Sequence, residues 1–332
     1  MRAMLLRAPA PVETGPLEAV DLPEPTPGPG QIRLNVTACG ICHTDLHEVE
    51  GELEPPRLPL VPGHQIVGLV DALGPGSRRF REGDRVGVAW LHETCGTCEA
   101  CRRGDENLCE RARFTGYHVD GGYAQLVLAP ERFAYALPKE ITDVEAAPLL
   151  CAGIIGYRAL RLSDIKPGER LGLFGFGASA HLALQVARFW QCEVLVFTRG
   201  AEHQELAKQL GAAWVGRAED EPPTRLDRAI SFAPAGSLIP LALAKLRKGG
   251  TMALAGIYLD RIPEMPYPLL YGERTLRSVT AATRRDAEEF LALAARIPIS
   301  TRVERFKLEE ANRALQHLKT SRIQGAGVLE IP

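Results

Sequence analysis

Four cysteines lie close together in a charged segment of the chain. They are spaced as C-x2-C-x2-C-x7-C, at Cys95, Cys98, Cys101 and Cys109. Two-residue spacers let successive thiolates converge on one centre, and four thiolates complete a tetrahedral Zn²⁺ shell with no open position. Iron–sulfur ligation uses similar spacing and is the alternative. The surrounding residues 92–113 include few apolar side chains, so we expect a small lobe that depends on a structural metal for its stability.

A second set of metal-binding residue types is dispersed along the chain. It consists of Cys42 in CGICHTDLH, His64 in PGHQ and Cys151 in LLCAG. Each residue alone would more often be an ordinary buried side chain. Together they offer two thiolates and one imidazole, a ligand set that leaves a fourth zinc position open for water or substrate. We therefore expect a catalytic metal here if the fold brings the three residues together.

A glycine-rich turn indicates nucleotide binding. Gly175, Gly177 and Ala180 form G-x-G-x-x-A between an apolar strand pattern and an amphipathic helix pattern, which is the context that a dinucleotide-binding loop requires. An acidic residue that binds the ribose is expected about twenty residues further on, at the end of the next strand. Thr198 and Arg199 stand there instead. We predict that both residues contact the cofactor and favour NADP(H), with NAD(H) also possible.

The elements around these residues indicate two kinds of domain. Residues 31–38 alternate apolar and polar side chains, and residues 60–90 contain short apolar runs interrupted by Gly and Pro, which favours a β-rich domain. Helix patterns cover 144–162, 181–189, 201–211 and 239–250, and strand patterns cover 170–174, 192–198, 225–234 and 251–257. This alternation predicts an α/β, doubly wound parallel sheet. Two further helices and a closing strand at 327–331 complete the tail.

Composition narrows the function classes. The chain has 332 residues, 45% hydrophobic and 24% charged, with a net charge of −2. No basic block is present, so we expect no nucleic-acid partner. No apolar run is long enough to span a bilayer, so we expect no membrane association. Because residues 1–15 also lack the apolar length of a signal peptide, we expect a cytoplasmic location. There the eight cysteines would remain reduced, and a cluster of them indicates metal ligands rather than disulfides.

Several segments resemble the zinc-dependent alcohol dehydrogenases of the medium-chain dehydrogenase/reductase family. They are CGICHTDLH, PGHQIVGLVDALGPG, CGTCEACRRGDENLC, TGYHVDGGYA, PLLCAGIIGY and GFGASAHLALQVA, which follow the family's order and cover most of the chain. The resemblance implies a GroES-like catalytic domain at 1–150 with the zinc-binding lobe at 92–113, a Rossmann domain at 151–285, and a tail at 286–332 that returns to the first domain. Alcohol dehydrogenase is also the known example of the Cys₂His zinc set.

The same resemblance implies roles for individual residues. Cys42, His64 and Cys151 match the ligands of a catalytic zinc, and the four clustered cysteines match those of a structural zinc, so two zinc ions per chain are expected. Thr44 and His47 match the path of the substrate proton, and Asp45 matches the carboxylate that orients the zinc-bound imidazole. Trp90 and Leu91 match positions that line the substrate pocket. Cys39 matches no ligand position. Gln65 stands where the family usually has Glu.

These features predict an enzyme that transfers a hydride reversibly between a primary or secondary alcohol and NAD(P)⁺, with zinc as Lewis acid. One alternative is a physiological NADPH-dependent aldehyde reductase. Another, of a different class, is a non-catalytic sensor that binds zinc and nucleotide on the same fold. The expected partners are a small alcohol or aldehyde and further copies of the chain, as a homo-dimer or homo-tetramer.

Overall fold

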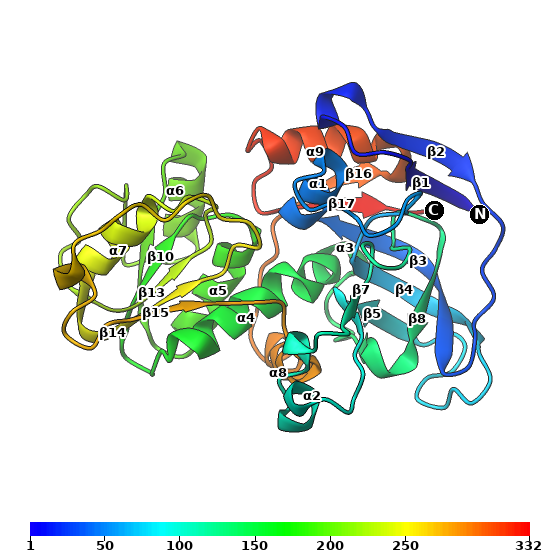
Figure 1. The fold of residues 1–332 in the computed structure, drawn as a ribbon, viewed down its shortest axis with the longest axis horizontal. Coiled ribbons are helices and arrows are strands. Elements are labelled where there is room, and N and C mark those ends of the chain that lie inside the picture. The colour runs from blue at the N-terminus through cyan, green and yellow to red at the C-terminus, as the bar shows by residue number, and fades with distance from the viewer. The chain divides into compact units, whose positions relative to one another are not determined.

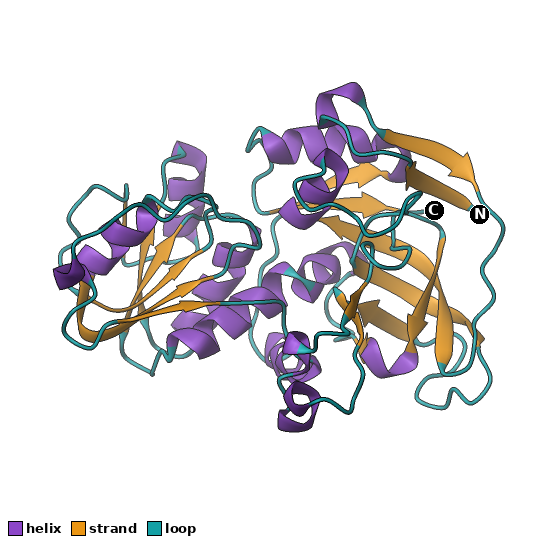
Figure 2. Ribbon diagram, in the orientation of Figure 1, coloured by secondary structure: helices purple, strands orange, loops and turns teal.

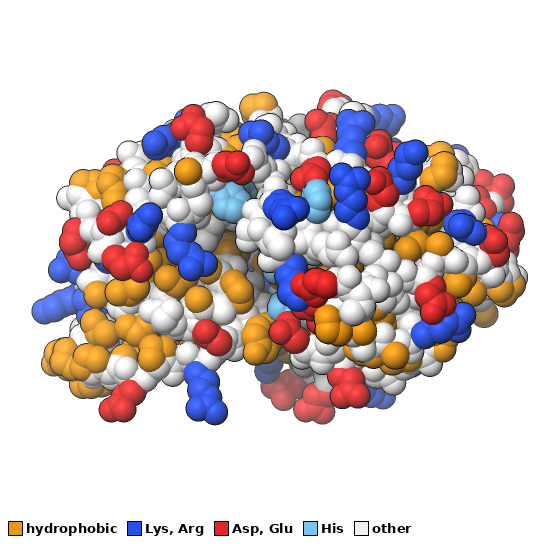
Figure 3. Space-filling view, turned by 90° about the horizontal axis from the view of Figure 1, so that it is seen from above, with side chains coloured by type: hydrophobic (Ala, Val, Ile, Leu, Met, Phe, Trp, Pro, Cys, Tyr) orange, Lys and Arg blue, Asp and Glu red, His pale blue; other side chains and the backbone are white.

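A computed structural model describes residues 1–332 and separates them into two units. The first unit contains Met1–Cys151, Ala282–Arg296 and Ser300–Pro332, and the second contains Ala152–Ala281 and Ile297–Ile299. No helix has the length and the apolar character needed to cross a membrane. Acidic and basic side chains are interspersed over the face shown in Figure 3, in keeping with the small net charge.

The first unit is organised around a seven-stranded sheet with the strand order β16-β17-β3-β4-β5-β9, in which β8 also pairs with β3 (Figure 1). These strands are β3 (Gln31–Ile41), β4 (Gln65–Leu73), β5 (Arg85–Val88), β8 (Leu126–Pro130), β9 (Ala134–Ala136), β16 (Val303–Lys307) and β17 (Ala326–Glu330). The closing strand β17 runs antiparallel to β3, with Gly327 opposite Ile41. The tail of the chain therefore supports the strand that leads directly into Cys42.

Smaller elements complete this unit. Two-stranded sheets pair β1 (Arg2–Leu6) with β2 (Leu17–Asp21) and β6 (Leu91–Glu93) with β7 (Arg113–Phe114). Its α-helices are α1 (His43–Glu50), α2 (Glu99–Arg103), α3 (Asp143–Ala146), α8 (Arg284–Ala294) and α9 (Ala311–Lys319). The core combines side chains that are far apart in sequence, such as Leu34, Ile66 and Leu329, all fully buried. Burial of this apolar surface is the main source of the unit's stability.

The second unit has a six-stranded sheet in which every strand pair is parallel, with the order β12-β11-β10-β13-β14-β15 (Figure 2). The strands are β10 (Arg170–Phe174), β11 (Glu193–Phe197), β12 (Trp214–Gly216), β13 (Leu226–Ser231), β14 (Leu246–Leu254) and β15 (Thr275–Ser278). The helices are α4 (Ala152–Ser163), α5 (Ala178–Phe189), α6 (Ala201–Gln209) and α7 (Leu238–Lys245). The predicted doubly wound sheet is confirmed.

This strand order reverses direction between β10 and β13, which lie side by side at the middle of the sheet. In open α/β sheets, ligands bind at the carboxyl ends of the strands where the order reverses. The glycine-rich turn begins at Gly175, directly after β10. The fold therefore places the turn at the position where a dinucleotide would be held.

The predicted continuous helix over 144–162 is wrong. The structure has α3, then a 3-10 helix η4 (Ala147–Leu150), then a break at Cys151 with φ −130° and ψ −70°, and then α4. Pro148 lies in η4, and its ring and missing N–H disfavour a continuing α-helix. The predicted helix over 239–250 also ends early, because Leu246 already begins β14, in which Gly249 has a φ of 72°. Apolar residues continue on both sides of Cys151 and obscure that boundary, whereas Gly249 and Gly250 mark the second boundary in the sequence itself.

Candidate functional site

The first unit brings Cys42, His64 and Cys151 together. Cys42 follows β3 and is the N-cap of α1, His64 immediately precedes β4, and Cys151 follows η4. The possible ligand atoms of the three residues lie within 4.8 Å of one another, and Cys42 Sγ is 3.3 Å from His64 Nε2. Tetrahedral zinc would place a sulfur and a nitrogen ligand about 3.6 Å apart. The spacing of the donor atoms therefore fits a zinc ion.

The electrostatics of the three residues also fit a cation. Burial raises the pKa of the Cys42 thiol well above its usual value. Burial lowers the pKa of His64, but the neighbouring Cys42 and Asp45 outweigh that effect and hold it well above its usual value. His64 itself is fully buried, whereas Cys42 and Cys151 are partly exposed. A divalent cation bound by two thiolates would supply positive charge beside these groups.

Asp45 lies behind His64, in the first turn of α1. Its Oδ1 is 3.1 Å from His64 Nδ1, without the alignment of a regular hydrogen bond, and both side chains are fully buried. Its Oδ2 accepts a 2.8 Å hydrogen bond from the backbone N–H of Cys42, which completes a capping box at the start of the helix. One carboxylate therefore contacts two of the three possible metal ligands and can orient the imidazole.

The remaining predicted proton-path residues also lie on α1. Thr44 and His47 are both nearly buried, and they are three residues apart, so they share one side of the helix. The backbone N–H of Thr44 donates to Cys42 Sγ over 3.3 Å. His47 Nδ1 lies 2.5 Å from Glu52 Oε2. Sequence reasoning did not single out Glu52, because an acidic residue after a helix is most often a solvated surface group.

Gln65 and Glu48 are two buried side chains of this region with polar atoms that lack hydrogen-bond partners. Gln65, the first residue of β4, is buried and its Nε2 lacks a hydrogen-bond partner. Glu48 on α1 is fully buried, and neither of its carboxyl oxygens has a partner. Burial, followed by the charge of Asp45, raises the pKa of Glu48 well above its usual value, whereas His64 acts in the opposite direction. Sequence reasoning missed Glu48, because only its burial distinguishes it from an ordinary helical glutamate.

Glu48→Gln is expected to stabilise the fold at neutral pH. Folding raises the pKa of Glu48 above its value in the unfolded chain, which is usually near 4.5. Below pH 4.5 the carboxyl is protonated in both states, so no free energy of unfolding is lost to its ionisation. As the pH rises from there through the folded pKa, the free energy of unfolding decreases. The melting temperature of the Gln variant should therefore exceed that of the parent by roughly 5 °C at pH 8 and by less at pH 5. Thermal unfolding across this range measures the difference, with Glu82→Gln, at an exposed position, as the control. A constant difference at all pH values would contradict the prediction.

Aromatic side chains lie next to the imidazole of His64. The ring centroid of Trp90 is 6.1 Å from that of His64, and Trp90 stacks on Phe114 at 4.1 Å. Leu91 is a buried residue of β6. Trp90 and Phe114 thus form an apolar wall beside the three possible ligands. Phe114 was missed because it pairs with β6 across the cysteine lobe, a contact that linear sequence does not reveal.

The four clustered cysteines converge as their spacing predicts for metal ligands, and their ligand atoms lie within 4.8 Å of one another. Cys95 Sγ accepts backbone N–H bonds from Thr97 and Cys98 at 3.4 and 3.2 Å, which lower the pKa of this thiol to about 5. The sulfur atoms of Cys95 and Cys101 are 3.9 Å apart, close to the edge of about 3.8 Å for tetrahedral zinc thiolates. Helix α2 in this lobe has no buried residue, so the lobe has little core of its own. Cys39 and Cys192 lie outside both sets.

The glycine-rich turn of the second unit leaves its backbone accessible. Gly175 has a φ of 84°, and Gly177 is the N-cap of α5, with no atom within 4 Å of the place where a side chain would begin. Ala180 is fully buried and permits close helix–strand packing. The first backbone N–H groups of α5 are therefore available to a phosphate.

Thr198 and Arg199 follow β11 in the same unit. Thr198 is nearly buried, and its backbone N–H donates to Gly216 O over 2.8 Å. Arg199 is exposed, and its guanidinium has no hydrogen bond or ion pair. His181, which sequence reasoning missed, is fully buried in α5, and burial lowers its pKa to about 4. This imidazole is therefore uncharged at neutral pH, and it lies on α5, the helix that follows the glycine-rich turn.

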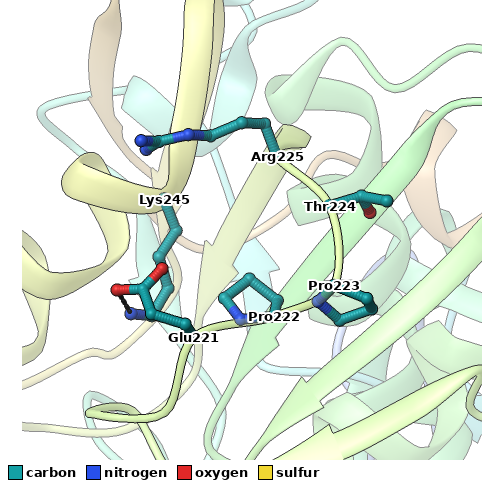
Figure 4. Close-up of a pocket in the computed structure, with 6 residues that line it drawn as sticks. All are labelled: Glu221, Pro222, Pro223, Thr224, Arg225 and Lys245. Atoms are coloured by element: carbon teal, nitrogen blue, oxygen red, sulfur yellow. Dashed lines mark hydrogen bonds and ion pairs between the residues drawn. The ribbon is translucent and has the colours of Figure 1, made fainter.

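A separate small pocket lies at the start of β13 in the second unit (Figure 4). It has a volume of about 180 Å³ and is lined by Glu221, Pro222, Pro223, Thr224, Arg225 and Lys245. The buried Lys245 amine lies 3.5 Å from Glu221 Oε1. The pocket is smaller than the roughly 300 Å³ that ligand sites commonly need, and it includes neither the glycine-rich turn nor Thr198. We therefore do not assign it to the cofactor.

Family profiles, relatives in sequence and solved structures all relate this chain to alcohol dehydrogenases. Family profiles described as "Alcohol dehydrogenase GroES-like domain" and "Zinc-binding dehydrogenase" match residues 28–139 and 180–296. The chain is similar to a probable alcohol dehydrogenase, AdhA, of Mycobacterium tuberculosis (strain CDC 1551 / Oshkosh), with 49% identity covering 100% of this chain and 97% of that protein. An alcohol dehydrogenase of Geobacillus stearothermophilus is 35% identical over 95% of this chain and 96% of its own. Among solved structures, a cinnamyl alcohol dehydrogenase from Sorghum bicolor matches with a TM-score of 0.91 at 27% identity, covering 99% of this chain and 97% of that one.

Proposed function

Because the chain belongs to the zinc-binding alcohol dehydrogenases of the medium-chain dehydrogenase/reductase family, we propose that it transfers a hydride reversibly between a primary or secondary alcohol and NADP⁺. The observation that carries this proposal is the convergence of Cys42, His64 and Cys151 within 4.8 Å, with Asp45 against the imidazole. These three residues would hold the catalytic zinc, and the four clustered cysteines would hold a second, structural zinc. The substrate is a small alcohol or aldehyde, and we propose a cytoplasmic homo-oligomer.

The chain's own residues would perform the steps around the reacting carbon. When bound, zinc supplies a Lewis acid, and the nicotinamide carries the hydride. Thr44 accepts the alcohol proton at its hydroxyl, and His47 passes that proton towards solvent. Asp45 keeps His64 in the orientation and tautomer that a metal ligand needs. Trp90 and Phe114 exclude water and select slender apolar substrates.

A steady-state survey of alcohols and aldehydes with both nicotinamide cofactors tests the activity. We expect saturable turnover in both directions, lost on removal of zinc. A purified, zinc-loaded protein that binds cofactor but turns over none of these substrates would overturn the proposal in favour of a sensor.

Thr44→Ala is expected to lower kcat by on the order of 10², because it removes the hydroxyl that receives the substrate proton. His47→Gln should cost less, about tenfold, since water can reach the outer part of the path. Stopped-flow measurement of alcohol oxidation separates these effects from product release. The control is Thr37→Ala, which removes a hydroxyl in β3 that donates to the backbone oxygen of Val67. Full activity in Thr44→Ala would remove this residue from the path.

The cofactor preference depends on Thr198 and Arg199. The carboxylate that would repel a 2′-phosphate is absent, and the exposed Arg199 guanidinium suits phosphate oxygens. We expect kcat/KM to be higher with NADP(H). Arg199→Ala should reduce this preference by roughly 1–3 kcal/mol, and Thr198→Asp should reverse it. The exposed Arg217→Ala, whose backbone rather than side chain bonds Asp220, is the control. A parent enzyme that favours NAD(H) would contradict the assignment.

A further inference from the structure

The chain turns back on α1 immediately after the helix ends. Gly51 caps α1 with a φ of 81° and a ψ of 8°, a left-handed conformation that glycine adopts without strain. The backbone N–H of Leu53 then donates to His47 O over 3.0 Å. These two features return residues 51–53 to the last turn of the helix. The residue between them, Glu52, reaches His47 Nδ1 at 2.5 Å.

The two members of this pair have different environments. The His47 side chain is 11% exposed, whereas that of Glu52 is 47% exposed. A carboxylate accepts but does not donate hydrogen bonds, so the Nδ1 atom facing it must carry the proton. The other ring nitrogen, Nε2, is then an acceptor. The imidazole therefore presents Nε2 as its basic nitrogen, while its Nδ1–H faces the carboxylate of the more exposed Glu52.

We propose that Glu52 is a positioning residue for proton transfer: it holds His47 as the Nδ1–H tautomer, so that Nε2 is the nitrogen that takes up the substrate proton. This inference rests on the proposed function, because it requires His47 to receive the substrate proton. During alcohol oxidation the hydride leaves carbon with the bonding electron pair and reduces NADP⁺, and the hydroxyl proton moves through Thr44 to His47. The imidazolium then releases one proton to water beside Glu52, which restores the original charge of the pair. Reduction of an aldehyde reverses these steps.

Among the other charged groups near α1, Glu48 is buried without a hydrogen-bond partner, and the rest have neighbours of their own. His43 lies 6.3 Å from His47, ring centroid to ring centroid, and burial, followed by the charge of His47, lowers the pKa of His43. Asp45 faces His64. On the neighbouring α9, Lys319 pairs with Glu50 at 2.7 Å and with Glu13 at 2.9 Å. The contact between Glu52 and His47 is thus separate from the ion pairs that attach α1 to α9.

The test uses the zinc-loaded protein with four substitutions: Glu52→Gln, Glu52→Asp, His47→Gln, and Glu54→Gln as the control. Glu54 lies two residues from Glu52, and its hydrogen bond with Tyr117 uses the backbone, whose oxygen accepts from the phenol. Glu52→Gln keeps the shape but can present an amide donor to Nδ1, so both tautomers become possible. We expect kcat to fall about fivefold to tenfold with KM for cofactor unchanged. Glu52→Asp should recover part of this loss, and Glu54→Gln should match the parent.

Nitrogen-15 NMR of the histidine rings gives a readout that does not depend on turnover. The His47 signals, assigned by their absence in His47→Gln, should report the Nδ1–H tautomer in the parent and a mixture in Glu52→Gln. In the His47→Gln background, Glu52→Gln should cause no further loss of kcat, because Glu52 acts through His47. An unchanged tautomer, or additive losses in the double variant, would overturn the inference. Normal kcat in His47→Gln alone would instead overturn the proton path itself.

Discussion

Cys42→Ser is expected to reduce kcat/KM at least about a thousandfold. The substitution removes one of the two thiolates that converge with His64, and a metal Lewis acid supplies several kcal/mol of transition-state stabilisation, each 1.4 kcal/mol being worth about tenfold. The fold should persist, because β3 and α1 retain their backbone bonds and their apolar packing. Metal analysis should fall from two zinc ions per chain to one.

The control for this variant is Cys39→Ala. Cys39 is a buried thiol in β3, three residues before Cys42, and it lies outside the ligand set. It should keep both zinc ions and most of the activity. If Cys39→Ala loses a zinc ion and Cys42→Ser keeps both, the ligand assignment is wrong.

Cys95→Ser should act on stability more than on chemistry. A four-cysteine zinc site contributes directly to folding, with apparent binding free energies of about 10–16 kcal/mol in small zinc-binding domains, and the lobe has no buried helix face to replace it. We expect loss of one zinc ion and a decrease in melting temperature of roughly 10 °C, while correctly folded molecules keep near-normal kcat.

Calorimetry together with metal analysis measures this effect. Cys192→Ser, at a buried thiol of the second unit outside both sets, serves as the matched control and should keep both metals. A Cys95→Ser protein with parental zinc content and stability would show that the four sulfur atoms do not hold a metal.

The fold class could be predicted because its signals are local. Alternation of strand and helix patterns is typical of a doubly wound sheet, and the six parallel strands confirm it. The break at Cys151 has one local signal, Pro148, which disfavours a continuing helix, but apolar residues at helical spacing on both sides of it outweighed that signal. Tertiary context, in which Cys151 turns towards Cys42 and His64, overrides that local preference.

The candidate site likewise contains some residues that the sequence indicates and others that only the structure reveals. The spacing of Cys95, Cys98, Cys101 and Cys109 is enough to predict one group of metal ligands, whereas the dispersed Cys42, His64 and Cys151 are assigned through the resemblance to the family. Glutamates are common, and Glu48 and Glu52 differ from their neighbours only in what surrounds them: one is buried without a partner and the other contacts an imidazole. Such roles depend on packing across the helix, which sequence spacing alone does not encode.

The pairing of β17 with β3 has a consequence for the order in which the chain folds. Every strand of the second unit lies between residues 170 and 278, so its sheet can form from a contiguous stretch of newly synthesised chain. The sheet that supports Cys42 instead needs residues 326–330 beside residues 38–41, a contact of very long sequence separation that forms slowly. During synthesis the six-stranded sheet can therefore form first, and the seven-stranded sheet closes only after translation of the tail.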